Sequence, residues 1–233
     1  MQSHHITHPH VTHPIITSLA ECSQRTKQRH PSSKNCHAIA LSAESGAGGK
    51  EVATILAERL NVPLYDREIM DAIAHETHLD KHLLERLDER VDGLKGAWLY
   101  SILAGKNFSR DNYRRTLVHV LLDIAYCCCH HGGVILGRGG SFILADKPVF
   151  RVHIVGSLAP CTARVAAREG ITLEEAKRKI KRKNKARRNY IKALFKCDNN
   201  DPTHFDLVIN SDHLPPAQIA DLIFEAWNCV KFK

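Results

Sequence analysis

The chain has 233 residues, 43% of them hydrophobic, and a formal net charge of +8. This length suits one domain with an appended segment, and the apolar fraction is sufficient for a buried core. No apolar run approaches the ~20 residues of a membrane-spanning helix, so we expect no membrane segment. Eight cysteines without a disulfide-like spacing indicate reduced thiols, and therefore a cytoplasmic location.

The chain begins with a polar stretch that we interpret as a disordered tail covering residues 1–35. It is rich in histidine (His4, His5, His8, His10 and His13) and lacks the long apolar segment of a signal peptide. We expect a single folded domain over residues 36–233.

The first element of that domain is an apolar strand from Ala38 to Leu41, followed by a glycine-rich turn and a helix from 51 to 60. A strand, a glycine turn and a helix start together favour phosphate binding by backbone N–H groups. The turn matches the pattern G-x-x-x-x-G-K-[ST] imperfectly in two registers. In one register Ala43 replaces the first glycine and Gly49 the lysine; in the other Gly49 and Lys50 form the Gly-Lys pair. Either way the hydroxyl residue that would bind Mg²⁺ is missing from its usual place.

The remaining elements alternate between strands and helices. After a strand at 64–65 we predict helices at 69–75, 79–91 and 116–130, with an ambiguous segment at 94–112. Strands follow at 134–136, 150–155 and 205–209, with helices at 158–169 and 219–230. A further helix is expected to begin at Thr172, where the segment from Thr172 to Glu175 has the pattern of a capping box. This alternation predicts an α/β fold with a central parallel sheet covered by helices on both faces.

In such a sheet, ligands bind beyond the carboxyl ends of the strands. Four polar segments follow predicted strands directly: the glycine turn, Asp66, Arg138 between glycines, and Asn210-Ser211. We therefore expect them to share one edge of the sheet. Asp66 could instead cap a helix that starts at the next residue.

Consecutive cysteines at positions 127–129 precede two histidines. Neighbouring positions on a helix point in different directions, and no second ligand pair stands nearby. We expect buried cysteines at a helix end rather than a zinc site.

The positive charge is concentrated in one segment. Residues 177–192 contain ten basic side chains and no acidic one; the remaining 23 basic and 25 acidic residues give a net charge of −2. Such a cluster favours a phosphate-bearing ligand. A solvated basic helix and a nucleic-acid-binding helix are the alternatives.

Taken together, these motifs resemble the cytidylate kinase-like family, a branch of the P-loop nucleoside monophosphate kinases. The resemblance rests on the segments at 42–53, 63–69, 134–139, 184–190 and 205–210, which occur in the family's order. It implies a three-layer P-loop kinase fold with a basic helical lid at about 172–198. It also implies ATP, as its Mg²⁺ complex, as the phosphoryl donor.

The resemblance further implies roles for individual residues. The donor phosphates would lie on the backbone from Ser45 through Gly46, Ala47, Gly48 and Gly49 to Lys50, with the Lys50 ammonium screening their charge. Asp66 and Arg138 would contact the acceptor, although Gly139 replaces an aspartate of the family. Arg164, Lys185, Arg187 and Arg188 resemble the lid, and Asn184 lies where the family often has aspartate. Arg164 could instead pair with Glu169 on the surface.

We therefore expect a kinase that phosphorylates a nucleoside monophosphate, CMP or dCMP first, or a similar small acceptor. A nucleotide-binding regulatory protein without catalysis is the alternative, because the loop lacks its Ser/Thr. Nucleic-acid binding through the basic helix ranks last. The metal ligands and the oligomeric state stay open.

Overall fold

The computed structural model describes residues 38–66, 69, 71–72 and 110–230. The predicted tail at 1–35, the helix at 79–91 and most of the helix at 69–75 lie outside these residues. The ambiguous segment at 94–112 also lies outside them up to residue 109.

The described part of the chain forms one parallel sheet of five strands. They are β1 (Ala38–Ala43), β2 (Leu64–Tyr65), β3 (Gly133–Leu136), β4 (Val149–Val155) and β5 (Leu207–Asn210). Their order is β2-β3-β1-β4-β5, and Leu41 of β1 pairs with Leu136 of β3 and Val152 of β4. The predicted parallel sheet is confirmed, with the strand before the glycine turn at its centre.

Side chains alternate between the two faces of β1, as the pleat of a strand requires. Ala38 and Ala40 belong to one buried cluster, while Ile39 and Leu41 belong to a second cluster on the opposite face. The central strand is therefore covered on both sides, which explains why it reads as an uninterrupted apolar run.

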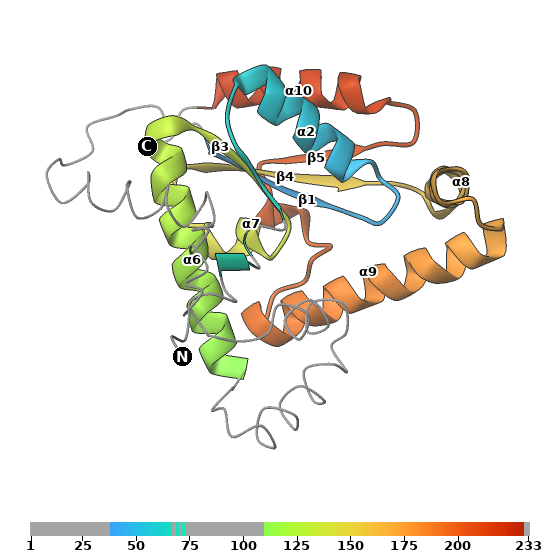
Figure 1. Ribbon diagram of the computed structural model, residues 1–233, viewed down its shortest axis with the longest axis horizontal. Coiled ribbons are helices and arrows are strands. Elements are labelled where there is room, and N and C mark those ends of the chain that lie inside the picture. Colours follow the sequence, from blue (N-terminus) through green and yellow to red (C-terminus); the bar gives the residue numbers. More distant parts are fainter. Residues whose placement is uncertain (1–37, 67–68, 70, 73–109, 231–233) are drawn as a thin grey trace, which may run out of the picture.

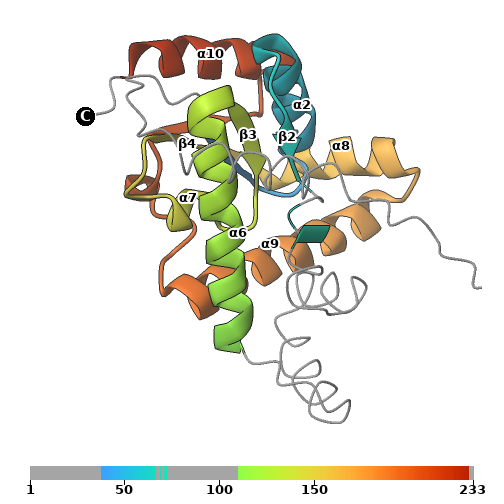
Figure 2. The ribbon, with the colours of Figure 1, turned by 60° about the vertical axis from the view of Figure 1, so that its left-hand side comes forward.

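Helices cover both faces (Figure 1). On one face lie α2 (Gly49–Leu60) and α10 (Pro216–Cys229), where the Arg59 guanidinium stacks 4.4 Å above the Phe224 ring. On the other lie α6 (Arg110–His131) and the short α7 (Gly140–Ile143), and Figure 2 shows α6 from its outer side. The chain between β4 and β5 forms α8 (Leu158–Glu169), α9 (Leu173–Phe195) and a 3₁₀ turn, η1 (Pro202–His204).

Helix α9 is the predicted basic helix, and it is anchored at both ends. Ala176 and Ile180 are buried in the cluster that contains α8, whereas Tyr190, Ile191 and Leu194 are buried in the cluster that contains α6. The residues between these anchors are mostly exposed. The charged middle of α9 therefore spans the gap between two packed ends.

Several boundaries differ from the sequence-based expectation. The helix expected at 116–130 begins at Arg110, the last helix begins at Pro216, and α7 was not predicted. Four residues are too few to show a hydrophobic period, which is why pattern reasoning misses α7. Cys128 is buried in the core and forms no disulfide, as expected. Within the described residues, no helix is long and apolar enough to cross a membrane.

The N-terminus of α9 carries the predicted capping box. The Thr172 hydroxyl accepts the Glu175 N–H at 3.3 Å, and the Glu175 carboxylate accepts the Thr172 N–H at 3.0 Å. We expect Thr172→Ala to lower the free energy of unfolding by about 1 kcal/mol, because an N-cap acceptor is lost. Urea denaturation monitored by circular dichroism measures this change. Thr172→Ser, which keeps the acceptor, should stay near wild type, and equal losses in both variants would contradict the capping role.

Candidate active site at the carboxyl edge of the sheet

The glycine turn joins the end of β1 to α2 and has a backbone that only glycine adopts readily. Gly46 has φ +87° and Gly48 has φ +81°. A Cβ added at Gly46 would lie 2.8 Å from the carbonyl oxygen of Cys161 in α8. The turn is closed by the Ala47 N–H, which donates to the Glu44 carbonyl at 3.1 Å. Conformation and close packing both require small residues here.

Helix α2 presents its positive end at this turn. Gly48 is the N-cap, and no side chain among the described residues caps the helix. The first N–H groups of a helix have no partner within it, and the helix dipole adds partial positive charge there. The turn and the helix start together have the properties of an anion-binding site.

The middle of α9 lies against the same turn. The Asn184 Oδ1 accepts the Ser45 N–H at 2.9 Å, and the Arg187 Nη1 donates to the Ala43 carbonyl at 2.7 Å. The two α9 side chains are three positions apart and therefore share one face of the helix. A neutral amide and one guanidinium, each more than 130 positions away in sequence, thus contact the glycine turn.

On one side of β1, Arg138 lies in the turn that follows β3. Gly137, Arg138 and Gly139 have φ values of +76°, +56° and +74°, and the Gly137 N–H donates to the Leu41 carbonyl at 2.8 Å. A left-handed non-glycine residue costs of order 1–2 kcal/mol, and such residues concentrate at functional sites. The conformation of Arg138 is consistent with a ligand-binding role.

Packing against the end of α9 favours glycine at the neighbouring position 139. A Cβ at this position would lie 2.5 Å from the Phe195 ring at the end of α9. The aspartate that the resemblance leads one to expect therefore has no room, and φ +74° would also disfavour it. The absence of that aspartate follows from how α9 ends.

On the other side of β1, Arg164 of α8 is fixed by the segment after β5. Its Nη1 donates to the Ser211 carbonyl at 2.7 Å and its Nη2 donates to the Ser211 hydroxyl at 3.0 Å. It does not pair with Glu169, whose carboxylate contacts Lys179 and Arg168. The surface alternative for Arg164 is therefore wrong.

Arg164 lines a cavity of about 270 Å³ beside the glycine turn. Ala47 and Gly48 form one wall, and residues 211–216 with Ile219 form the other. Asp212 is held in place because its carboxylate accepts the Ser157 N–H at 2.7 Å, and this bond lowers the pKa of Asp212. The cavity is mixed in character, with a guanidinium, a carboxylate and two prolines.

The strand order separates the predicted site residues into two groups. Asp66 and Arg138 follow β2 and β3, whereas Arg164 and Ser211 lie beside β4 and β5, with the glycine turn of β1 between them. Lys185 and Arg188 are exposed on α9, next to the residues that contact the turn. Arg164 thus lies across β1 from Arg138.

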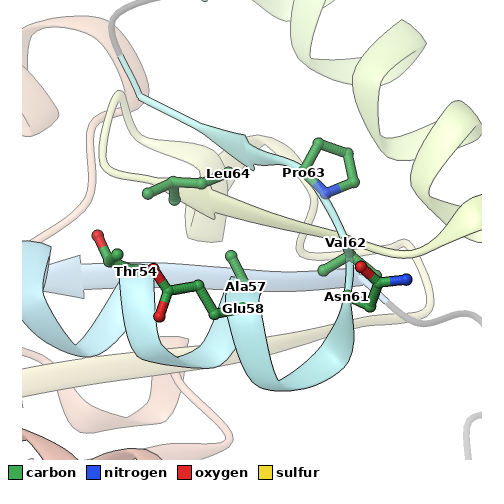
Figure 3. A pocket seen from close by; sticks show the side chains of 7 residues that line it. All are labelled: Thr54, Ala57, Glu58, Asn61, Val62, Pro63 and Leu64. Carbon is green, nitrogen blue, oxygen red and sulfur yellow. The ribbon is translucent and has the colours of Figure 1, made fainter.

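A larger hollow of about 460 Å³ lies elsewhere. Figure 3 shows its lining, which comes from Thr54, Ala57 and Glu58 of α2 and from residues 61–64 at the start of β2. These residues lead into the amino end of β2, whereas the glycine turn follows the carboxyl end of β1. Size alone would therefore select the wrong part of the molecule.

His153 of β4 lies beneath the site and was not singled out by its sequence. Its side chain is 3% exposed and stacks on Phe205 with ring centres 4.6 Å apart. Burial lowers the pKa of His153; the Glu44 carboxylate opposes this shift, and the Arg187 charge adds to it. Burial therefore favours the neutral form of the His153 imidazole by lowering its pKa.

The residues that sequence reasoning missed are polar groups whose partners are distant in sequence. Asn184 was noted only as a departure from the family. The Glu44 carboxylate accepts the Gly156 N–H at 3.2 Å, and no local pattern of the sequence predicts a role for Glu44 or for Asp212.

Position 50 has no hydroxyl for Mg²⁺, and the described residues contain no group of three His, Cys, Asp or Glu side chains that could hold a metal. These residues fit only a Mg²⁺ bound mainly by the phosphates of a nucleotide.

Comparison with known proteins identifies the family of this chain. A profile of the cytidylate kinase-like family matches residues 38–213. The chain belongs to this family. A search of curated proteins finds no match.

Three solved structures are similar to this chain to different degrees. A crystal structure of an uncharacterized protein from Eubacterium ventriosum ATCC 27560 superposes with a TM-score of 0.62 and 23% identity, over 82% of this chain and 98% of that chain. A shikimate kinase from Bacteroides thetaiotaomicron gives 0.44 and 16%, over 80% and 93% of the two chains. A shikimate kinase from Acinetobacter baumannii in complex with shikimate gives 0.48 and 13%, over 86% and 97%.

This cytidylate kinase-like chain therefore has an α/β fold with a central parallel sheet covered by helices on both faces. The predicted family and fold class are confirmed.

The buried His153 predicts a pH dependence of stability. Because its pKa is lower in the folded state than the ordinary ~6.5, the unfolded chain binds the proton more readily, and stability falls as the pH drops below ~6.5. We expect His153→Phe to lose less stability between pH 7.5 and 5.5 than wild type, as measured by urea denaturation at each pH. His119→Gln, which removes an exposed imidazole, serves as the control. Identical pH profiles for wild type and His153→Phe would contradict this assignment.

Proposed function

We propose that this protein transfers the γ-phosphoryl group of ATP, bound as its Mg²⁺ complex, to a nucleoside monophosphate or a similar small phosphorylated acceptor. One observation carries the proposal: an uncapped helix start and a glycine turn open at the carboxyl edge of the sheet, between Arg138 on one side and the Arg164 cavity on the other. Family membership supports a kinase-like function but leaves the acceptor open.

In this proposal the donor lies on the glycine turn and in the adjoining cavity. The N–H groups from Ser45 to Lys50 bind the phosphates, and the Lys50 ammonium adds charge at the first turn of α2. The base enters the cavity between Arg164 and the prolines at 215 and 216, where a guanidinium and flat apolar surfaces suit an aromatic ring. When bound, Mg²⁺ neutralises part of the phosphate charge.

The acceptor lies on the other side of β1. Arg138 binds its phosphate, and Asp66 contacts its nucleoside part. Lys185, Arg187 and Arg188 of α9 surround the group in transfer. The acceptor oxygen forms a bond to the γ-phosphorus while the bond to the bridging oxygen of ADP breaks, so the protein contributes alignment and positive charge.

CMP and dCMP are the first acceptors to test, on family grounds. The missing side chain at Gly139 means that contacts to the base must come from other residues, so the panel should include all common nucleoside monophosphates. The protein works in the cytoplasm in this proposal.

A nucleotide-binding regulator of the same fold is the second candidate. Lys50 stands where a hydroxyl usually holds Mg²⁺, which favours binding without chemistry. Calorimetry with ATP combined with a coupled assay separates the two candidates. Saturable ATP binding without turnover on any acceptor favours the regulator. The absence of ATP binding would contradict both the kinase and the regulator.

Arg138 offers a test that separates function from folding. Arg138→Gly places the residue that best tolerates φ +56° at this position, so we expect the thermal midpoint to change little. Turnover should fall by about 10²–10³-fold, because a contact to a transferring or bound phosphate is lost. Arg114→Ala on the exposed side of α6 is the control. Wild-type turnover by Arg138→Gly would remove Arg138 from the site.

A further inference from the structure

The side-chain position of Gly49 points back across the glycine turn toward the end of β1. A Cβ added at Gly49 would lie 2.3 Å from the Cβ of Ala43 and 3.6 Å from Leu41. In the usual phosphate-binding loop, the residue after the last glycine is the lysine that reaches the phosphates, and the first residue is glycine. In this chain neither residue is present: position 43 is alanine and position 49 is glycine, and the Ala43 methyl fills the space that the stem of such a lysine would need.

Lys50 does not occupy that space. It is the next residue of α2, about 100° further around the helix, and its side chain is exposed. The position that points across the turn therefore carries no charge of its own, although a polyphosphate bound there would carry several negative charges.

Arg187 brings a cation to the same place from another element. Its Nη1 donates to the carbonyl of Ala43, the residue whose methyl excludes a lysine at position 49. A guanidinium has five N–H donors in a planar fork that matches phosphate oxygens. The Asn184 contact to the Ser45 N–H fixes the same face of α9 two residues further along the turn.

Because α9 is anchored at both ends, the Arg187 guanidinium is held at the glycine turn. Buried residues on both sides, Ile180 before and Tyr190 after, hold the helix while Arg187 itself remains exposed. The cation therefore stands at the turn before any ligand arrives, as a lysine within the loop would.

We infer that Arg187 replaces the missing loop lysine, so that the phosphate-binding cation of this protein is supplied by α9 rather than by the glycine turn, with Asn184 as a positioning residue. This inference rests on the proposed function, because it names the group that binds the donor polyphosphate.

Binding measurements on the full chain test it. We expect Arg187→Met to weaken binding of both ATP and tripolyphosphate by about 10- to 100-fold in calorimetry, because a hydrogen bond to a charged group is lost. Arg182→Met removes the same charge from an exposed position on the same helix and should change affinity less than about twofold. Tripolyphosphate has no base, so a parallel loss for both ligands locates the effect at the phosphates.

A rescue experiment distinguishes charge supply from simple support of the fold. Adding Ala43→Gly and Gly49→Lys to Arg187→Met opens the blocked space and restores a lysine within the loop. We expect this triple variant to regain affinity to within a few fold of wild type. Gly49→Lys without Ala43→Gly should fail to rescue and should lower the thermal midpoint, because the lysine stem meets the Ala43 methyl.

The outcomes are distinct. If wild type binds ATP and Arg187→Met binds it equally well, the inference is overturned while the proposed function stands. A folded triple variant that stays as weak as Arg187→Met also overturns it. If the triple variant does not fold, the affinity of Arg187→Lys is measured instead. A partial loss of affinity in Arg187→Lys supports the inference, and wild-type affinity in both Arg187→Lys and Arg187→Met overturns it. If wild type binds neither ligand, the proposed function itself fails.

Discussion

The glycine turn depends on the absence of side chains at three positions. At Gly46 a side chain would meet the backbone of α8, and at Gly49 it would meet the end of β1. Gly48 has a left-handed conformation and begins α2 without a capping side chain. These constraints let α2 and α8 approach β1 so closely that backbone amides, not side chains, line the opening of the sheet.

The strand order determines what surrounds that opening. With β1 in the centre, the turns after β3 and β4 necessarily flank the glycine turn, and those after β2 and β5 lie one strand further out. Arg138 and Arg164 therefore lie on opposite sides of β1, so that in the proposed reaction they would contact different substrates. A donor on one side and an acceptor on the other is the arrangement that transfer between two bound molecules needs.

Helix α9 connects these two sides and explains the uneven charge of the chain. Its ends contribute to both hydrophobic clusters, so the ten basic residues lie on a segment whose position is fixed by packing. Where this segment crosses the turn, Arg187 meets a carbonyl and Asn184 meets an N–H. Such matched contacts let a strongly basic helix rest on an anion-binding turn, whose N–H groups alone would repel it.

The same helix determines what the site lacks. Phe195 at its end fills the space beside Gly139, so the side chain that the family resemblance assigns there is absent for a steric reason. Alanine at position 43 and glycine at position 49 are a second departure, and α9 contacts the loop at the same place through Arg187.

The sequence by itself determined the fold class, the order of the five strands of the sheet along the chain, the capping box at Thr172 and the family. These follow from local patterns: an apolar run before glycines, a hydrophobic period, and a hydroxyl three residues before a carboxylate. It did not determine the start of α6 or the existence of α7, where a short or weakly periodic segment carries no signal of its own. Only the tertiary structure decided which cation meets the glycine turn, which side of β1 holds Arg164, and why residue 139 is glycine. Each of these depends on contacts between residues distant in sequence, and such contacts are set by how helices pack on the sheet rather than by any local pattern.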